Sequence, residues 1–572
     1  MTNWEKAQKR AEEIDEQILN VLRSGKSFRV EAGAGAGKTY SLEKVVQCIS
    51  DEQREEFARN EQYVACITYT NVAAEVIRKR LPENSFVRPS TIHAFAWSLM
   101  NQFQATLISL VEKLELSKTY NEKNILEPKI QRVVYSQGIR YVDEGTLFLS
   151  HNDVIDLFAL ILDNKKFRYI LSNRYPVILI DEYQDSFEKI MSQFVKYFIE
   201  PEYGPQFGLF GDAWQTIYSA SGACGLIESE KLKEIRKEAN FRSEEVIVEA
   251  LNRMRPELPQ ISALDQTDGK ILVITTNNID ETNRIDKGRD KGDLKEEIRK
   301  DVVEKVQRKL QEQGWQENTK ILMLTHKYLA MQQEYQQLYE VLGNHFRNQD
   351  DIHFQYFQNL VEPVFHALQN NDAKRLAEIL GTSCSPVLSY NYKQKWNRFG
   401  RDLEKARKKV IYDVINIVAD SGLLDVPPKI KAYKEQYEDG ANTEYGEKTL
   451  KEFYEIPYEE VVKAIEFFAP ESMFSTDHGV KGEQYENVLL VLGRGWSNYK
   501  FDETLYKVEE SMSEAEKKKY VRNRNLFYVC CSRAEKRLAI LITTSTNEQF
   551  KEYLERIFGT DVILEYGSFM EE

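Results

Sequence analysis

The sequence is short of glycine and proline. It has 27 glycines and 14 prolines among 572 residues, which is about 7% where average usage gives about 12%. Together with 29% charged residues, this shortage argues against collagen-like, β-helical and loop-dominated folds and favours a helix-rich protein. Aromatic residues (11%) and the apolar set (42%) suffice for several hydrophobic cores, which excludes global disorder.

Long apolar segments and metal-type cysteine spacings are also missing. The N-terminus is charged from Glu5 onward, so we expect no signal peptide. No stretch approaches the ~18 consecutive apolar residues of a membrane span. The six cysteines show no CxxC spacing, which argues against zinc or iron–sulfur sites and fits free thiols in a reducing compartment. We therefore expect a cytoplasmic protein that binds no membrane.

Positive charge is in the minority. Acidic residues outnumber basic ones by 91 to 77, for a net charge of −14; this argues against a basic nucleic-acid coat but not against a DNA enzyme, which needs only local positive charge. The stretch 393–409 has eight basic and two acidic residues, with Trp396 and Phe399 between them. It is typical either of phosphate contact with stacking or of a solvated helix with two core aromatics. The acidic stretch 435–460 could repel DNA or meet a basic partner.

Short apolar strands alternate with helical patterns twice along the chain, which predicts an α/β protein with two parallel sheets. Each sheet is interrupted by a segment with mainly helical periodicity. The expected strands are 27–30, 64–67, 176–180 and 207–210, then 270–274, 320–324, 488–492 and 538–542. The expected domains are a first core of 1–96 and 164–235 with an insertion at 97–163, and a second core of 236–343 and 471–572 with an insertion at 344–470.

A glycine-rich turn between the first strand and the next helix has the composition of a phosphate loop. Small residues let backbone N–H groups face the phosphates, and the following helix N-terminus favours an anion. Lys38 would reach the β- and γ-phosphates, and Thr39 would hold Mg²⁺. Ala32 replaces the first glycine of the general GxxxxGK[ST] pattern. The loop consists of Ala32, Gly33, Ala34, Gly35, Ala36, Gly37, Lys38 and Thr39.

Two carboxylates follow the apolar strand 176–180. We assign Asp181 to Mg²⁺, through its water shell, and Glu182 as the general base that activates water. Alone this pattern would be a weak signal, but paired with the phosphate loop in this order it predicts hydrolysis of ATP or GTP.

Further motifs stand in a fixed order around these two. With them, the chain resembles the superfamily 1 helicases of the UvrD/Rep/PcrA type. The resemblance implies two RecA-like P-loop cores, each with an insertion, and ATP with Mg²⁺ as cofactors. The motifs are ITYTNVAA (67–74), STIHAF (90–95), DEYQD (181–185), FGDAWQTIY (210–218), NFRS (240–243), TDHGVKG (476–482) and LFYVCCSRA (526–534).

The resemblance implies a set of contacts to the nucleoside of ATP. Gln17 lies 21 positions before Lys38, where the family's adenine-reading glutamine usually sits, and its amide can both donate and accept. Phe241 would stack on the adenine, and Tyr40 stands where relatives often have an arginine for the other face. Gln484 replaces a glutamate near the ribose.

The resemblance also implies residues that act on the γ-phosphate. Gln215 resembles the residue that senses this phosphate. Arg242 and Arg533 resemble two arginines that reach it from the second core, a cationic fork of a kind typically worth 10³–10⁵ in rate.

Contacts to the DNA backbone are implied at six positions in the motifs. Relatives usually have a Trp-Arg pair after Tyr218, but here the matching residues are Ala220 and Ser221, so one stacking platform worth about 1–3 kcal/mol per base is missing. The six positions are Thr70, Thr91, His93, Tyr218, Thr476 and His478.

The function that we expect is that of an ATP-dependent translocase or helicase on single-stranded or tailed duplex DNA, with the 3′→5′ polarity that the resemblance implies. The alternative is a DNA-sensing ATPase subunit that controls a partner nuclease with little unwinding of its own, as in Gabija-type anti-phage defence. An ATPase that acts on no nucleic acid, and RNA as the track, both stay open. The sequence does not decide among them.

Overall fold

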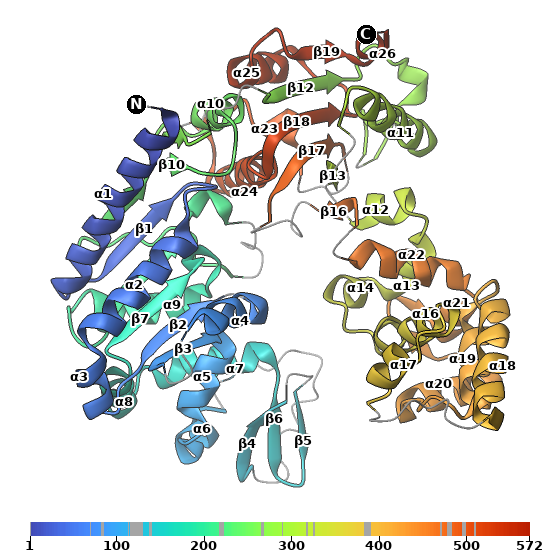
Figure 1. The fold of residues 1–572 in the computed structure, drawn as a ribbon, viewed down its shortest axis with the longest axis horizontal. Helices are drawn as coiled ribbons and strands as arrows, with labels where there is room; N and C mark the ends of the chain where they lie inside the picture. Colours follow the sequence, from blue (N-terminus) through green and yellow to red (C-terminus); the bar gives the residue numbers. More distant parts are fainter. Residues whose placement is uncertain are drawn as a thin grey trace.

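The computed structural model contains two six-stranded sheets that lie next to each other, and two insertions that extend from them (Figure 1). In Figure 1 both insertions lie in the lower half of the view, one below each sheet. The structure describes residues 2–68, 70–81, 85–111, 114, 130–136, 140–216, 222–264, 268–288, 290–315, 319–323, 326–381, 390–469, 472–476, 483–494, 499–507 and 511–571.

The first sheet has the strand order β3-β2-β7-β8-β1-β9, and its ladders are parallel. The strands expected from the sequence form its centre and are almost fully buried, because helices cover both faces of a parallel sheet. The strands are β1 (Phe28–Ala32), β2 (Val64–Thr68), β3 (Val87–Thr91), β7 (Val177–Asp181), β8 (Gln206–Gly211) and β9 (Lys233–Lys237). The helices around it are α1 (Asn3–Arg23), α2 (Lys38–Glu52), α3 (Arg54–Arg59), α4 (Asn71–Arg80), α5 (Ile92–Met100), α8 (Lys165–Arg174) and α9 (Glu188–Phe194).

The second sheet repeats this architecture with the parallel order β16-β13-β17-β18-β12-β19. A short parallel ladder of β10 (Ala239–Asn240) and β11 (Ile261–Ser262) precedes it. Its strands are β12 (Lys270–Thr275), β13 (Thr319–Met323), β16 (Phe474–Thr476), β17 (Tyr485–Leu492), β18 (Ala534–Ile542) and β19 (Ile563–Glu565). The helices are α10 (Glu245–Met254), α11 (Glu296–Glu312), α23 (Phe501–Thr504), α24 (Glu514–Cys531), α25 (Glu548–Phe558) and α26 (Tyr566–Glu571). The two parallel sheets confirm the predicted α/β class.

The first insertion contains a small sheet that the sequence did not predict. Besides α6 (Gln104–Val111) and α7 (His151–Ile161), it has three short strands in the order β4-β6-β5. Strand β6 pairs parallel with β4 and antiparallel with β5. The strands are β4 (Arg132–Tyr135), β5 (Tyr141–Asp143) and β6 (Thr146–Leu149). Strands of three or four residues are too short to show an alternating pattern clearly, so the sequence pattern of residues 97–163 predicted mainly helix.

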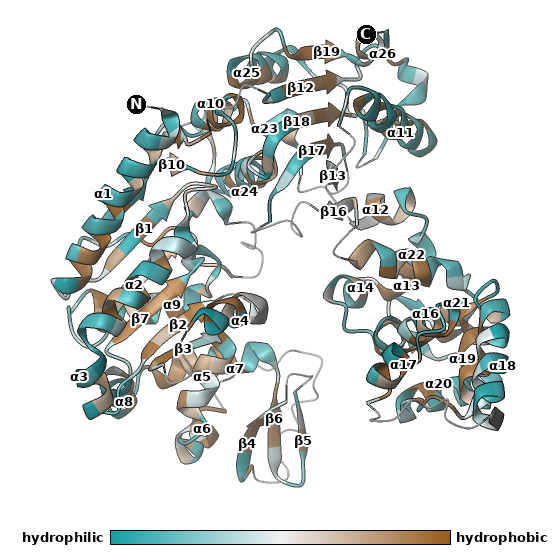
Figure 2. Cartoon of the chain, in the orientation of Figure 1, coloured by the Kyte–Doolittle hydropathy of each residue, from teal (hydrophilic) through white to brown (hydrophobic). Residues whose placement is uncertain are grey.

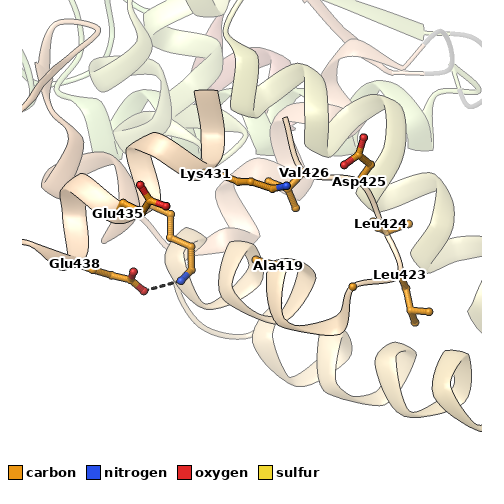
Figure 3. Close-up of a pocket in the computed structure, with 10 residues that line it drawn as sticks. Ala419, Leu423, Leu424, Asp425, Val426, Lys431, Glu435 and Glu438 are labelled. Carbon is orange, nitrogen blue, oxygen red and sulfur yellow. Dashed lines mark hydrogen bonds and ion pairs between the residues drawn. The ribbon is translucent and has the colours of Figure 1, made fainter. Parts of the chain in front are cut away.

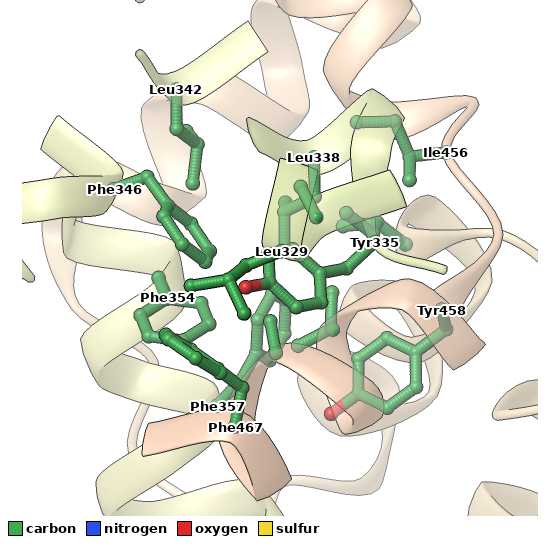
Figure 4. Close-up of a cluster of buried hydrophobic side chains, with 14 of the residues drawn as sticks. Leu329, Tyr335, Leu338, Leu342, Phe346, Phe354, Phe357, Ile456, Tyr458 and Phe467 are labelled. Atoms are coloured by element: carbon green, nitrogen blue, oxygen red, sulfur yellow. The ribbon is translucent and has the colours of Figure 1, made fainter. Parts of the chain in front are cut away.

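The second insertion is helical and shares one continuous hydrophobic cluster with the second sheet, which includes Ile321 of β13 and Phe346 of the insertion. Figure 4 shows part of this cluster, where Tyr335, Phe346 and Phe354 gather near Leu329. Two helices lead from β13 toward the insertion, α12 (His326–Gln332) and α13 (Gln336–Leu342). The helices of the insertion are α14 (Asn344–Asn348), α15 (Ile352–Tyr356), α16 (Glu362–Gln369), α17 (Ala373–Ile379), α18 (Tyr390–Ala406), α19 (Ile411–Ser421), α20 (Pro428–Glu438), α21 (Leu450–Tyr454) and α22 (Tyr458–Phe468), with a hairpin of β14 (Glu444–Tyr445) and β15 (Lys448–Thr449).

The basic stretch 393–409 lies mostly on helix α18, and the burial of its two aromatic side chains shows whether they are core residues or stacking residues. Trp396 and Phe399 are buried in the hydrophobic cluster, whereas basic residues such as Lys395 and Arg398 are exposed. The rings are therefore core residues and do not stack on a ligand. Figure 2 shows the same separation for the molecule at large, with brown strands inside and teal helices outside. Among the helices described, none combines the length and the apolar character needed to span a bilayer.

Candidate nucleotide site between the two sheets

The glycine-rich loop connects β1 to α2 and packs directly against the segment that leads from β10 to α10. Gly35 has a φ of +73°, and a Cβ there would lie 2.6 Å from Asn240 Oδ1, so only glycine fits. The carbonyls of the loop point to this segment: Ala34 O accepts from Asn240 Nδ2 at 3.0 Å, and Gly35 O accepts from the Phe241 amide at 3.0 Å. The second core thus fixes the shape of the loop. Ala32 ends β1 and is fully buried.

A polar cavity of about 260 Å³ lies over this loop. It is lined from the first core by loop residues 33–39, Glu182 and Gln215, and from the second by Phe241, Arg242, Gln484 and Arg533. The structure therefore brings together at one place most of the residues predicted for the phosphates.

Lys38 and Glu182 form an ion pair inside this cavity, with 3.5 Å between Lys38 Nζ and Glu182 Oε1. Glu182 has a left-handed backbone with a φ of +49°, a conformation that costs of order 1–3 kcal/mol in a residue other than glycine. Its other carboxylate oxygen accepts from Gln184 Nε2 at 2.6 Å. Asp181 ends β7, and its Oδ1 accepts from the Glu182 amide at 3.1 Å. The sharp turn after β7 therefore directs the Glu182 carboxylate into the cavity and leaves Asp181 at the strand end.

Two guanidinium groups enter the cavity from the second core. Arg242 donates to Gln484 Oε1 at 3.2 Å and to the Ser532 carbonyl at 3.1 Å. Arg533 is 1% exposed and donates to Gln215 Oε1 at 3.3 Å. Burial and the nearby charge of Arg533 lower the pKa of Arg242 to about 9, and burial also lowers the pKa of Arg533. Two neighbouring cations that repel each other, Arg533 buried and Arg242 half-buried, favour an anion between them.

A second cavity, of about 340 Å³, adjoins the first and shares Ala36, Gly37 and Phe241 with it. It is less polar, and the ring of Tyr40 lines it together with that of Phe241. Tyr40 is 59% exposed, with Lys44 Nζ 4.7 Å from its ring centre. Trp4 meets Phe241 edge to face at 5.7 Å. A flat ring next to the phosphate cavity would fit between these aromatic side chains.

The structure does not bring Gln17 to the cavities. Gln17 is exposed on α1 and does not line either cavity, whereas Gln8 of the same helix lines the aromatic cavity. The two residues are nine positions apart, which places them about 180° apart around a helix. The family spacing counts residues from Lys38, whereas in this structure the face of the unbroken α1 decides which side chain points toward the cavity. Sequence reasoning did not single out Gln8, and the signal that could have placed it at the cavity is its shared helix face with Ala11, Glu12 and Asp15.

The residues predicted for DNA lie in part at the carboxyl ends of β2 and β3. Thr70 and Thr91 are the N-caps of α4 and α5, and their hydroxyls accept backbone N–H bonds from Ala73 and Ala94. The ring of His93 packs edge to face on His151 and on Phe187. Burial and the neighbouring His151 lower the pKa of His93 to about 4, so His93 is neutral at pH 7. Tyr218, Ala220, Ser221 and His478 lie outside the described residues, as does the side chain of Thr476 at the end of β16.

Another cavity, of about 610 Å³, lies in the second insertion between the end of α19 and α20 (Figure 3). Lys434 pairs with Glu438 there at 2.6 Å, and residues of both charges line it. None of the residues predicted for the nucleotide or for DNA is among those that line this cavity.

Comparisons with known proteins agree with the motifs. A family model described as an AAA domain matches residues 15–221. The ATP-dependent DNA helicase Rep of Buchnera aphidicola is 29% identical, over 39% of this chain and 42% of its own. The Pif1 helicase from Candida albicans, a solved structure, aligns with 42% of this chain and 43% of its own, at 18% identity and a TM-score of 0.25. The resemblance to superfamily 1 helicases of the UvrD/Rep type is confirmed.

One relative is similar over nearly the whole chain. The Gabija protein GajB of Bacillus cereus (strain HuB5-5) is 23% identical, over 95% of this chain and 96% of its own. The chain is thus similar from end to end to a Gabija protein, and only in part to Rep.

Proposed function

We propose that this protein is an ATPase of the superfamily 1 type that is driven by single-stranded DNA and moves along it. The observation that carries the proposal is the polar cavity, because its loop and Glu182 come from one sheet while Arg242 and Arg533 come from the other. A triphosphate held there would contact both cores, so its hydrolysis would change how they are held together.

The contacts support a division of roles among the residues. Lys38 pairs with Glu182, and a triphosphate would offer Lys38 a stronger partner. Glu182 would then be left to take a proton from the attacking water. Arg242 and Arg533 would offset the charge that develops on the transferred phosphoryl group, and Gln215 would report its presence through Arg533.

Magnesium is the metal that these residues would suit. The hydroxyl of Thr39 lines the cavity and the Asp181 carboxylate ends the neighbouring strand, and hard oxygen ligands of this kind suit Mg²⁺. When bound, the metal would neutralise phosphate charge. In the aromatic cavity we propose that Tyr40 and Phe241 hold the adenine, that Gln8 reads its edge, and that Gln484 lies toward the ribose.

For single-stranded DNA we propose the backbone contacts that the resemblance implies, at Thr70, Thr91, His93, Tyr218, Thr476 and His478. We also propose the four-part division, with cores of 1–96 with 164–235 and 236–343 with 471–572, and insertions of 97–163 and 344–470. The 3′→5′ polarity and true unwinding of a duplex belong to the same proposal.

The test is ATP hydrolysis with and without single-stranded DNA, run beside unwinding of 3′- and 5′-tailed duplexes. We expect turnover to rise with DNA in the wild type and to disappear in Lys38→Ala and Glu182→Gln, with the circular dichroism spectrum of both variants unchanged. DNA-stimulated turnover that persists in either purified variant would refute the assignment of the site.

A second candidate function is supported by the similarity to the Gabija protein over 95% of this chain. In this alternative the chain is an ATPase subunit that senses DNA and controls a nuclease partner in anti-phage defence. The exposed basic residues of α18 and the acidic stretch 435–460 offer surfaces of both signs for such a partner. DNA-stimulated ATPase without unwinding, together with co-purification of a nuclease, would favour this alternative over the motor.

A further inference from the structure

A buried cross-core ion pair lies behind the proposed γ-phosphate site. Arg255 follows α10, which packs on the second sheet, yet its guanidinium reaches the first sheet. It donates to Asp212 Oδ1 at 2.5 Å and to Glu31 Oε1 at 2.9 Å. All three residues are at most 5% exposed. None of the three carries a role in the proposed hydrolysis, and a buried charge cluster of this size is expensive to desolvate.

The Asp212 carboxylate also binds Gln215, the residue that faces Arg533. Asp212 Oδ2 accepts from Gln215 Nε2 at 2.7 Å, and Gln215 Oε1 accepts from Arg533 at 3.3 Å. A carboxylate only accepts and a guanidinium only donates. Between these two groups the Gln215 amide therefore has one workable orientation, with its nitrogen on Asp212 and its oxygen on Arg533.

The backbone that carries Asp212 and Gln215 is anchored separately. Asn525 of α24 donates to the carbonyls of Ala213 and Thr216, at 3.1 and 3.2 Å, and the Trp214 ring lies 3.9 Å from the guanidinium carbon of Arg524. These contacts to the turn do not involve Arg255, although its guanidinium carbon also lies 5.4 Å from the Trp214 ring and its partner Glu31 accepts from the Ala213 amide at 2.8 Å. Asp212 Oδ1 accepts from the Trp214 amide at 3.0 Å within the turn, and Arg255 adds a charged partner from the second core that holds the Asp212 carboxylate and, through it, the amide of Gln215.

The charges of Arg255, Asp212 and Glu31 are consistent with a role of Arg255 in holding the Asp212 carboxylate. Burial raises the pKa of Glu31, and the neighbouring Asp212 raises it further. Burial alone would lower the pKa of Arg255, but Asp212, Tyr528 and Glu31 outweigh it, so the pKa is raised. Arg255 is therefore a permanent countercharge for two carboxylates that would otherwise repel each other.

We propose that Arg255 is a positioning residue that acts through Asp212 to hold the Gln215 amide toward Arg533, and so couples the second core to the site of phosphate transfer. The proposal rests on the proposed ATPase function. A misplacement of about 1 Å in such an arrangement can cost about 10²-fold in rate. Since the loop and the aromatic cavity do not include Arg255, the effect should fall on kcat and leave the KM for ATP almost unchanged.

The experiment compares kcat and KM for DNA-stimulated ATP hydrolysis, with kcat counted per site from the stoichiometry of a bound fluorescent ATP analogue. We expect Arg255→Gln and Asp212→Asn each to lower kcat about 10- to 100-fold with KM within about threefold. Arg255→Lys should recover part of the loss, because an ammonium keeps the charge but cannot bridge both carboxylates as a fork. The double variant should lose no more than the worse single variant, since both act on one path.

Arg284→Gln is the matched control. Arg284 is 3% exposed in the same core and donates to the carbonyls of Gly292 and Thr543. Arg533 directly precedes β18 and Thr543 directly follows it, so the two residues lie at opposite ends of the strand. This variant should destabilise the core and keep its kcat per bound nucleotide within about twofold.

The outcomes separate the two proposals. An inactive wild type would refute the proposed function, whatever the variants do. An active wild type with kcat within twofold in Arg255→Lys and Asp212→Asn would overturn the positioning role, and so would an equal loss of kcat in Arg284→Gln. If Arg255→Gln binds no nucleotide because it does not fold, Arg255→Lys and Asp212→Asn decide.

Discussion

The choice of glutamine on α1 gives a sharp test of the proposed nucleoside site. Gln8 lines the aromatic cavity and Gln17 lies on the opposite face of the same helix. Replacing either by alanine keeps or slightly improves the helix propensity of its position. The two variants therefore differ in one respect that matters, which is whether an amide is removed from the cavity.

The size of the effect follows from the hydrogen bonds that the amide can make. An adenine edge offers one donor and one acceptor to the Gln8 amide, and each net bond is worth about 1 kcal/mol. Gln8 Nε2 now donates to Glu12 Oε1 at 3.0 Å, and giving up that exposed bond returns part of the gain. A net of about 1–2 kcal/mol remains, which is about 5- to 30-fold in affinity.

The assay is competition of ATP and GTP against a fluorescent nucleotide for the wild type, Gln8→Ala and Gln17→Ala. We expect Gln8→Ala to weaken ATP binding by this factor and to reduce the preference for ATP over GTP. Gln17→Ala should stay within twofold of the wild type for both nucleotides. Unchanged ATP affinity in Gln8→Ala, or an equal loss in Gln17→Ala, would refute the placement of the adenine in this cavity.

Three further predictions concern burial and charge. Trp396→Ala should destabilise the second insertion by about 3–5 kcal/mol, as expected for a buried aromatic residue. Arg398→Ala, at an exposed position of the same helix, should change the free energy of unfolding by no more than about 0.5 kcal/mol. Urea unfolding of both variants measures this difference, and equal midpoints would show that Trp396 is not a core residue. Burial of Asp15 favours its neutral form, but the charge of Lys237 and hydrogen bonds from Ser41 and Lys44 outweigh it and lower the pKa of Asp15 below 3.8. The charged carboxylate therefore stabilises the fold above pH 3.8. This contribution is lost as the pH falls through the lowered pKa. The difference in urea midpoint between the wild type and Asp15→Asn should therefore be constant from pH 7 to 5 and shrink below about pH 4, and a difference independent of pH would contradict it. A non-hydrolysable ATP analogue at 100 times its Kd should stabilise the wild type by about 2.7 kcal/mol. At the same concentration the thermal shift should be smaller in Arg242→Gln, which removes one of the two guanidinium groups that line the cavity; an undiminished shift would show that Arg242 does not meet the phosphates.

The parts of the site that the sequence predicted are those carried by short continuous strings. The phosphate loop needs Gly35 and Gly37 at positive φ and a lysine at the start of a helix, and all of this lies within a few neighbouring residues. Asp181 and Glu182 likewise follow a strand whose apolar run marks it as central. Such local patterns survive in any chain that keeps the strand, the turn and the helix.

The parts that the sequence missed depend on which faces meet in space. Gln8 and Gln17 are both polar residues on a charged helix, and only the packing of α1 distinguishes them. Arg255 lies 43 positions from Asp212 and 224 from Glu31, and no spacing rule joins residues so far apart. Trp396 and Phe399 were ambiguous for the same reason, because an aromatic side chain on a basic helix is a core residue or a ligand contact according to what covers it.

The polar cavity also explains how a chain with a net charge of −14 can bind a polyanion. The charged groups that line it are Lys38, Arg242 and Arg533 against one carboxylate, Glu182, a local excess of positive charge. Arg533 is buried and Arg242 is half-buried, and attraction to a phosphate is stronger there than at the open surface because the effective dielectric constant is lower. Exposed carboxylates more than about 8 Å away are screened by salt at physiological ionic strength. The local field therefore favours an anion such as the proposed triphosphate in this cavity, despite the acidic excess elsewhere in the chain.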